Sequence, residues 1–301
     1  MTERHDSAAA LFCLSAYLQS AMRALHLIHG RFAPYMKWLP ESTRRLCPDF
    51  APLMDKALKG GRDTVDIIND YIKKALRDNF ITDTADAPLA VIAAELLDKA
   101  QRVNTAEKII AIEWAMFDKV QNKGGRAFCQ DDYTTFSIMR KSQYYTYSGK
   151  LLESLLADFT EAASQGRNVI TEKYGYMMRY TVPEEYAAIE SALPPVNEKK
   201  QALIDAIAPI QVGWMEDLAG KYPKLAGQAR SIHSYEDTEN GTSYETYLRG
   251  ELATYSEDSL ALYGAFIVGI YRSGGNLAEM IIGNSVHMYG YRSFDEAEKA
   301  Q

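Results

Sequence analysis

The residues with the clearest chemical potential gather in the window from Asn122 to Tyr147. A guanidinium group binds carboxylates and phosphates through paired hydrogen bonds, so Arg126 and Arg140 predict an anchor for an anion. Asp131 or Asp132 could act as a general base towards that anion, or could pair with the arginines instead. The window is therefore either a catalytic centre or an internal salt-bridge network that orients a turn between helices.

Arg140 is expected on a helix that has a polar and aromatic face. Gln143, Tyr144 and Tyr147 follow it by three, four and seven residues, a spacing that keeps side chains on one face of a helix. Burial of such a face costs free energy unless its polar groups meet partners or a ligand. We therefore expect Gln143, together with Gln130, to orient a bound anion, and the tyrosines to line its pocket.

A second polar and aromatic set follows the turn at Gly166-Arg167-Asn168. Glu172 and Tyr174 are expected beside the substrate. Lys173 or Tyr174 could supply a proton if its side chain were removed from water. The alternative for this set is exposed charge on the surface of a helix.

Thiol and metal chemistry find less support in the sequence. Cys129 has no neighbouring histidine to lower its pKa, so we expect a buried, unreactive thiol. The three cysteines form no CxxC pair and the five histidines form no HExxH motif. No dinucleotide-binding glycine motif is found either, so no cofactor is expected, and a helical metalloenzyme is kept only as a third alternative.

Helices are the elements that must position these residues. Apolar residues recur at helical spacing, whereas strand-like alternation is nearly absent, so the sequence predicts an all-α fold. The spacing is clearest in segments 7–32, 64–80, 87–103, 105–122, 148–167, 198–220 and 256–274.

Composition narrows the class of protein. The net charge of −7 argues against a surface for nucleic acid or for an anionic membrane. No run approaches 18 consecutive apolar residues, so no membrane span is expected. Few, unpaired cysteines are typical of a reducing compartment, and we therefore expect a cytoplasmic protein.

Two breaks divide the chain. The polar stretch 81–90 and the pair Pro194-Pro195 predict an N-terminal helical unit over 1–83 and two further units over 84–193 and 194–301. The last two units share an order of motifs, which begins with Trp114 and Trp214 in equivalent places. We interpret them as divergent repeats, and two such units packed together commonly enclose a cavity.

The repeat region resembles bacterial proteins of the domain-of-unknown-function family 4125, over roughly residues 100–300. The resemblance rests on the pattern Trp-x-x-Phe, Asn-x-Gly-Gly-Arg-Ala-x-Cys-Gln-x-Asp, Thr-Phe and Met-Arg-x-Ser-Gln. It is carried by Trp114, Phe117, Asn122, Gly124, Gly125, Arg126, Cys129, Gln130, Asp132, Thr135, Phe136, Met139, Arg140 and Gln143. This resemblance implies a helical fold and a bacterial cytosolic setting, but no reaction.

The segment 23–41, RALHLIHGRFAPYMKWLPE, resembles the helical C-terminal part of a nucleotidyltransferase-like family, domain-of-unknown-function 4037. The Gly-Ser turn and Asp-x-Asp pair of the catalytic lobe are missing, so nucleotidyl transfer is not expected. The resemblance implies at most docking to a nucleotidyltransferase-like partner, and a homo-oligomer is an equal alternative.

These observations together predict an enzyme that acts on a small polar, anionic metabolite by acid–base chemistry, as a lyase, a hydrolase or a transferase. The site would lie in a cavity between the helical repeats. The alternative is a metabolite-binding or scaffold protein without turnover.

Overall fold

A computed structural model of the chain describes residues 7–59, 63–79, 81–82, 84, 86–122, 124–238 and 241–301. Throughout these ranges the regular elements are helices, and no β-strand occurs in them, which confirms the all-α prediction. The chain forms two compact units, an N-terminal unit over Met1–Asp98 and a C-terminal unit over Lys99–Gln301.

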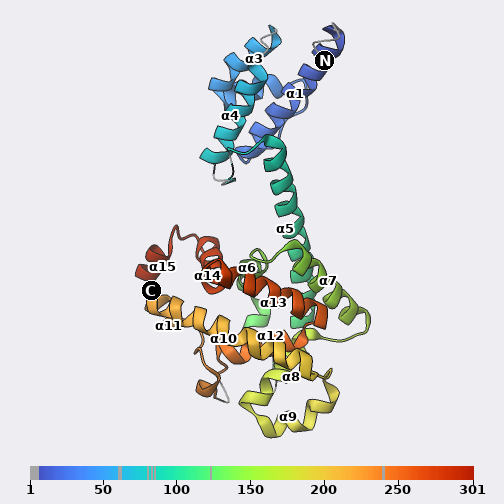
Figure 1. The fold of residues 1–301 in the computed structure, drawn as a ribbon, viewed down its shortest axis with the longest axis vertical. Coiled ribbons are helices and arrows are strands. Elements are labelled where there is room, and N and C mark those ends of the chain that lie inside the picture. The colour runs from blue at the N-terminus through green and yellow to red at the C-terminus, as the bar shows by residue number, and fades with distance from the viewer. Residues whose placement is uncertain are drawn as a thin grey trace. The chain divides into compact units, whose positions relative to one another are not determined.

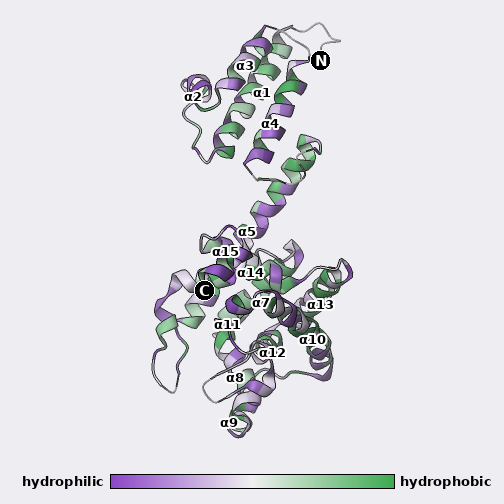
Figure 2. Cartoon of the chain, turned by 90° about the vertical axis from the view of Figure 1, so that its left-hand side faces the viewer, coloured by the Kyte–Doolittle hydropathy of each residue, from purple (hydrophilic) through white to green (hydrophobic). Residues whose placement is uncertain are grey.

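The N-terminal unit is a small bundle in which α1 packs against α2, α3 and α4 (Figure 2). Its helices are α1 (Ser7–Ile28), α2 (Leu39–Leu46), the 3₁₀ turn η2 (Pro48–Phe50), α3 (Ala51–Leu58) and α4 (Thr64–Asp78). Apolar side chains at helical spacing form its core, among them Leu18, Leu25, Phe50 and Ile68. The long first helix ends where Gly30 adopts a φ of 64°, as the sequence predicts.

Among the described residues, one segment, Ala9–Ile28 of α1, is long and apolar enough to cross a membrane. Length and composition are the whole of that criterion, and core helices can meet it too. In this structure, one face of the segment, which includes Leu18 and Leu25, is buried in the core of the N-terminal unit.

The helix α5 (Leu89–Phe117) differs from the prediction of two helices over 87–103 and 105–122. It continues through Asn104, and the hydroxyl of Thr105 donates a hydrogen bond to the Gln101 carbonyl within it. It ends at Phe117, five residues before the expected end at Asn122.

The C-terminal unit contains the end of α5 and ten further α-helices among its described residues (Figure 1). They are α6 (Tyr133–Tyr144), α7 (Gly149–Ser164), α8 (Val169–Thr181), α9 (Pro183–Ile189), α10 (Glu198–Lys221), α11 (Pro223–Gly227), α12 (Tyr244–Thr254), α13 (Glu257–Arg272), α14 (Leu277–Met288) and α15 (Phe294–Ala300). Short 3₁₀ turns are η3 (Phe128–Asp131), η4 (Glu190–Ala192) and η5 (Ser234–Glu236). The predicted break at Pro194-Pro195 separates η4 from α10.

Two series of helices in this unit have similar lengths and caps. The helices α6, α7 and α8 have 12, 16 and 13 residues, and α12, α13 and α14 have 11, 16 and 12. Ser148 and Ser256 cap α7 and α13, and Asn168 and Asn276 cap α8 and α14, through the same type of hydrogen bond. The descent of both series from one repeat stays a prediction.

The two series pack against each other across the unit. The helix α6 of the first series lies against α14 of the second, and α12 of the second lies against α8 of the first. The approach of α8 and α12 depends on Gly250, because a Cβ there would lie 2.6 Å from Cγ of Met177 and 3.0 Å from the carbonyl oxygen of Lys173. These close contacts position the polar residues described next.

Candidate functional site

The joint between α5 and α6, comprising the described residues 118–122 and 124–132, is closed by Gln130. Its buried amide Nε2 donates hydrogen bonds to the carbonyl oxygens of Phe117 at 2.8 Å and Val120 at 2.9 Å. Its Oε1 accepts from the backbone N–H of Ala127 at 2.8 Å. Carbonyls at the end of a helix need such partners, so Gln130 is committed to the backbone.

Arg126 is also committed within the joint. Its Nη2 lies 2.7 Å from Oδ1 of Asp118, and its Nε lies 2.9 Å from Oδ1 of Asp131. It also donates to the backbone carbonyls of Asp118 and Gln130. Hydrogen bonds from these two carboxylates raise the pKa of the Arg126 guanidinium. The internal salt-bridge network considered from the sequence thus describes Arg126 and Asp131.

Asp132 begins the next helix. Its Oδ1 accepts a hydrogen bond from the backbone N–H of Thr135 at 3.0 Å, which makes it the N-cap of α6. Hydrogen bonds from Thr135 lower the pKa of the Asp132 carboxyl. The capping role of Asp132 accounts for its position.

The expectation of a buried thiol at Cys129 is wrong, because the side chain is exposed. In the turn η3 the inward place belongs to Gln130, which is 1% exposed, while neighbouring Phe128 is 90% exposed. The need to satisfy the backbone at the end of α5 decides which residue of the turn points inward.

Arg140 lies in a different environment, between two buried glutamates. It binds Glu113 through two hydrogen bonds, Nε to Oε2 at 2.8 Å and Nη2 to Oε1 at 2.7 Å. Its Nη1 lies 3.2 Å from Oε2 of Glu251. The side chains of Arg140, Glu113 and Glu251 are 11%, 2% and 10% exposed, so these charges are almost removed from water. Such charges persist in a core when they are paired.

Gln143 and two tyrosines complete the surroundings of Arg140. Gln143 accepts a hydrogen bond from Nη1 of Arg140 at 2.7 Å and donates to Oε1 of Glu251 at 2.9 Å and to the Tyr147 hydroxyl at 2.6 Å. The Tyr144 hydroxyl accepts from Nη2 of Arg140 at 2.5 Å. Tyr144 and Tyr147 are fully buried, and burial raises the pKa of both phenols. They enclose the charges.

Lys173 extends this network towards the surface. Its buried Nζ lies 3.6 Å from Oε2 of Glu251, 2.9 Å from the Tyr247 hydroxyl and 4.2 Å from the centroid of the Tyr247 ring. We call Glu113, Arg140, Gln143, Lys173 and Glu251 the charged network. Its two cations and two carboxylates balance.

The pKa of the Tyr247 phenol is lowered, in contrast to the buried tyrosines nearby. Burial raises this pKa, but the Lys173 ammonium and the Arg140 guanidinium outweigh burial and the Glu251 carboxylate. Tyr247 as a whole residue is only partly buried.

Two residues border Tyr247 where it meets solvent. Burial and the neighbouring Tyr247 phenol raise the pKa of Tyr174, and the guanidinium of Arg230, an exposed residue, lies 4.9 Å from the Tyr247 ring centroid. Arg230 donates a hydrogen bond to the Thr242 carbonyl, and no carboxylate within the described ranges forms an ion pair with it. The network therefore ends in a phenol pair beside an unpaired cation.

The two glutamates of the network have pKa values shifted in opposite directions. Burial raises the pKa of Glu113, and the nearby Glu251 carboxylate raises it further. The Arg140 guanidinium lowers this pKa but does not overcome the other two effects. Burial acts in the same direction on Glu251, but Arg140 and Lys173 overcome it and lower its pKa to about 2. Neighbouring charges thus move the pKa values of two carboxyl groups in one network apart.

The ten candidate residues from the sequence fall into separate places. Glu172 lies at the start of α8, where Arg167 holds it through hydrogen bonds of 2.7 and 2.8 Å. The others divide between the joint (Arg126, Gln130, Asp131, Asp132), the charged network and its tyrosines (Arg140, Gln143, Tyr144, Tyr147) and the phenol pair (Tyr174). Arg126 and Arg140 share no partner, so they do not form one anion site.

Sequence analysis did not select Glu113, Glu251, Tyr247 or Arg230. One signal pointed to Glu251. It precedes the capping residue Ser256 by five residues, as Gln143 precedes Ser148, and the two side chains meet at 2.9 Å.

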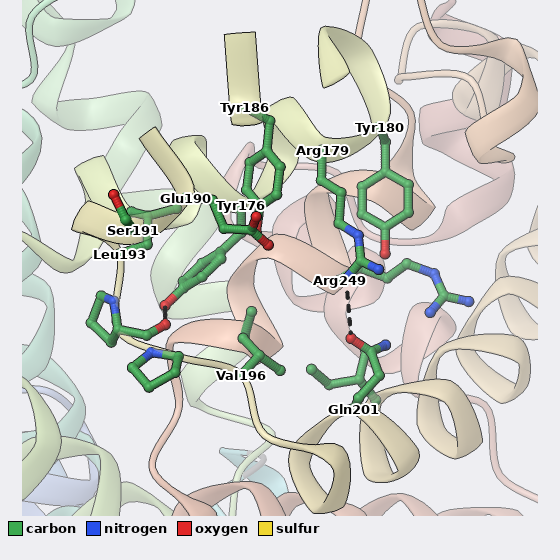
Figure 3. Close-up of a pocket in the computed structure, with 14 residues that line it drawn as sticks. Tyr176, Arg179, Tyr180, Tyr186, Glu190, Ser191, Leu193, Val196, Gln201 and Arg249 are labelled. Atoms are coloured by element: carbon green, nitrogen blue, oxygen red, sulfur yellow. Dashed lines mark hydrogen bonds between the residues drawn. The ribbon is translucent and has the colours of Figure 1, made fainter. Parts of the chain in front are cut away.

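The C-terminal unit also contains a cavity of about 410 Å³, separate from the charged network. The wall comes from α8, α9, η4, the double-proline segment, α10 and α12 (Figure 3). It is lined by Tyr176, Arg179, Tyr180, Tyr186, Glu190, Ser191, Leu193, Pro194, Pro195, Val196, Gln201, Ile204, Arg249 and Ala253. None of the ten candidates is among these residues.

The part of the chain that the structure describes contains no arrangement of side chains that could bind a metal ion. No group of three or more His, Cys, Asp or Glu side chains lies close enough to hold an ion there.

Comparison with known proteins gives one relationship. No curated protein and no solved structure matches the chain. Residues 103–299 match the family described as protein of unknown function (DUF4125), which covers most of the chain and nearly all of the C-terminal unit. The chain therefore belongs to the DUF4125 family.

Proposed function

We propose that the C-terminal unit is an enzyme that performs acid–base chemistry on a small anionic substrate, with Tyr247 as the group that transfers the proton. The observation that supports this most is the distance of 2.9 Å between Nζ of Lys173 and the Tyr247 hydroxyl. A buried ammonium at this distance stabilises a phenolate, and the pKa of Tyr247 is lowered accordingly.

The charged network would keep this pair ready for proton transfer. Tyr247 as a phenolate would accept a proton from the substrate, and as a phenol it would return one. Lys173 would act as a positioning residue that donates a hydrogen bond to the phenolate. Glu251, 3.6 Å from Nζ, favours the ammonium form of Lys173 despite its burial.

Arg230 would attract the substrate. Its guanidinium lies over the Tyr247 ring, is exposed, and has none of the described carboxylates as a partner. An anion bound there would lie next to the phenols of Tyr174 and Tyr247. Proton transfer of this kind suits a lyase, a hydrolase or a transferase, and we propose a cytoplasmic setting for it.

The first test measures the titration of Tyr247. Selective ¹³C labelling of tyrosine and NMR titration should show one phenol with a pKa below those of the other tyrosines. The resonance of that phenol should be absent in Tyr247→Phe. In Lys173→Met the pKa of the Tyr247 phenol should be higher than in the native protein. If the phenol of Tyr247 titrates together with the exposed tyrosines or above them, the acid–base proposal fails.

The second test measures turnover on a panel of small carboxylates and phosphorylated metabolites. Loss of a general acid–base group typically lowers the rate by about 100-fold to 10,000-fold. Tyr247→Phe should show this loss, whereas Tyr145→Phe should not, because the Tyr145 hydroxyl binds Glu107 outside the charged network. Equal turnover by the two variants would remove Tyr247 from the reaction.

A second candidate function is metabolite binding without turnover, and the 410 Å³ cavity favours it. In that case the charged network would only fix the packing of α6, α8 and α12. Tyr247→Phe would then leave ligand affinity unchanged, and no member of the metabolite panel would be converted. Docking to a nucleotidyltransferase-like partner and homo-oligomer formation stay predictions from the sequence.

A further inference from the structure

The cavity presents one cation that has no carboxylate partner. Arg179 lies in the last turn of α8, is exposed, and makes one hydrogen bond, to Oε1 of Gln201 at 3.5 Å, the outer limit for such a bond (Figure 3). No described carboxylate forms an ion pair with it. A guanidinium has five N–H donors, so most of those of Arg179 are free for a ligand.

The other arginine of the wall is already neutralised. Nη1 of Arg249 lies 2.7 Å from Oδ1 of Asp205, and its Nε lies 2.9 Å from Oε1 of Glu245. The Arg249 side chain is 15% exposed, with Glu245 at 17% and Asp205 at 55%, so its pair with Glu245 is the more shielded of the two. Arg179 is thus the guanidinium of this wall that can bind an anion.

An uncompensated carboxylate faces the same cavity. Glu190 is exposed, and burial together with this carboxylate raises the pKa of the Tyr186 phenol, which leaves the negative charge of Glu190 in place. Glu190 and Arg179 are not ion-paired with each other, although both act on the Tyr186 phenol. Figure 3 shows both charged groups at the cavity, from different helical segments. The rim therefore carries one positive and one negative group.

The inner wall is aromatic and apolar. Tyr176 is 6% exposed, and its hydroxyl donates a hydrogen bond to the Pro194 carbonyl at 2.5 Å, so its ring is fixed against the wall. Leu193, Pro195, Val196, Ile204 and Ala253 add apolar surface to the lining. A ligand that enters here finds charge at the rim and an apolar surface inside.

We propose that this cavity binds a small zwitterion, an α-amino acid with an apolar or aromatic side chain. Its carboxylate would bind Arg179, its ammonium would bind Glu190, and its side chain would lie against Tyr176 and Ile204. A plain carboxylate would leave Glu190 without a partner and would be repelled by it. Cavities of roughly 300–1,000 Å³ hold drug-sized ligands, so 410 Å³ suits an amino acid.

The cavity site is independent of the proposed reaction at Tyr247. The same two helices carry both places: α8 contributes Lys173 and Arg179, and α12 contributes Tyr247 and Ala253. None of the residues of the charged network lines the cavity. Failure of the proposed reaction at Tyr247 would therefore not count against amino-acid binding in the cavity, and the reverse also holds.

The test uses three related probes with the full-length protein, measured by titration calorimetry or ligand-observed NMR. L-Phenylalanine carries both charges, N-acetyl-L-phenylalanine lacks the ammonium, and L-phenylalaninamide lacks the carboxylate. We expect L-phenylalanine to bind best. Loss of either charge should weaken binding about tenfold, because a hydrogen bond to a charged group contributes about 1.5 kcal/mol or more.

Variants assign each charge to its residue. Arg179→Met should lower the affinity for L-phenylalanine about tenfold and leave the affinity for L-phenylalaninamide unchanged. Glu190→Gln should lower the affinity for L-phenylalanine and leave the affinity for N-acetyl-L-phenylalanine unchanged. Arg272→Met, an exposed arginine outside the wall, is the matched control and should change nothing. Ser191→Phe, at the exposed rim, should block all three probes.

Three outcomes would overturn this proposal. One is the absence of saturable binding of L-phenylalanine up to about 10 mM. Another is equal affinity for the zwitterion in the native protein and in Arg179→Met. The third is binding that survives unchanged in Ser191→Phe, which would place the probe elsewhere.

Discussion

The joint and the charged network both come from the polar window 122–147, but they solve different physical problems. In the joint, Gln130 and Asp132 bind backbone groups within 13 residues of themselves in sequence. In the network, Arg140 binds Glu113 and Glu251, which lie 27 and 111 residues away. The joint satisfies helix ends, whereas the network joins the four helices α5, α6, α8 and α12 through charges removed from water.

The comparison separates polar residues that local rules explain from those that need another reason. Helix ends require caps, and the joint supplies them. Core helices need no buried ion pairs, because apolar side chains of similar volume often stabilise a fold as well or better. The charged network is therefore the better candidate for function.

The largest expected effect comes from breaking the network at Glu251. In Glu251→Gln the buried Arg140 and Lys173 retain one buried carboxylate, Glu113, between them. Removal of one partner from a buried ion pair costs about 3–5 kcal/mol. We expect a loss of this size in the free energy of unfolding of the C-terminal unit, measured by urea titration.

Arg126→Met is the matched change in the joint. The Arg126 side chain is 45% exposed, and exposed ion pairs contribute about 0–1 kcal/mol. A small loss is expected here. If Arg126→Met destabilised the unit as much as Glu251→Gln, the distinction between the two regions would be wrong.

The pH dependence of stability should show the same contrast. The pKa of Glu251 falls from an ordinary 4.5 to about 2 in the folded state. Its stabilisation is therefore fully present above pH 4.5 and is lost as pH falls towards 2, a change of about 3 kcal/mol. The raised pKa of Glu113 acts in the opposite direction, because its burial as a carboxylate costs free energy until it is protonated.

The measurement that isolates Glu251 is the difference between native protein and Glu251→Gln. Urea unfolding at several pH values from 2 to 6 should show the stability difference shrinking as the pH falls through 4.5. A difference that stays constant over this range would mean that Glu251 is not held ionised by Arg140 and Lys173.

Much of the fold could be predicted from the sequence, because helices follow local rules. The apolar period predicted the helical class, and Pro194-Pro195 predicted a break between helices. The end of α5 was missed, since it depends on the amide of Gln130, 13 residues beyond Phe117.

The candidate site could be predicted only in part. The face of Arg140, Gln143, Tyr144 and Tyr147 was visible from helical spacing. Its partner Glu251 lies 111 residues from Arg140, and the place that it shares with Gln143, five residues before a capping serine, was the one sequence signal for it. Buried ion pairs of this kind depend on tertiary packing.

Gln130 should show an intermediate effect, because it is the buried member of the joint. Gln130→Ala removes the donor to the Phe117 and Val120 carbonyls and the acceptor for the Ala127 N–H. Unsatisfied buried groups cost about 1–3 kcal/mol, and we expect about 2 kcal/mol in the free energy of unfolding. Gln165→Ala, at an exposed helix end, should change it by less than about 0.5 kcal/mol.

The expected effect at Asp132 is smaller than that at Gln130, and the Asp132 variants decide between a cap and a general base. Asp132→Ala removes the acceptor for the Thr135 N–H and should cost about 1 kcal/mol of unfolding free energy. Asp132→Asn keeps an acceptor oxygen and should retain nearly all of that stability, since Asn and Asp are equally good N-caps.

The two Asp132 variants also differ in what they would do to catalysis. Asp132→Asn removes the charge and the basicity of the carboxylate but preserves the cap. If Asp132 only caps α6, this variant should keep the turnover and the Tyr247 titration of the native protein. A loss of turnover in Asp132→Asn with unchanged stability would mean that Asp132 takes part in catalysis. The joint would then belong to the active site, and the charged network would only stabilise it.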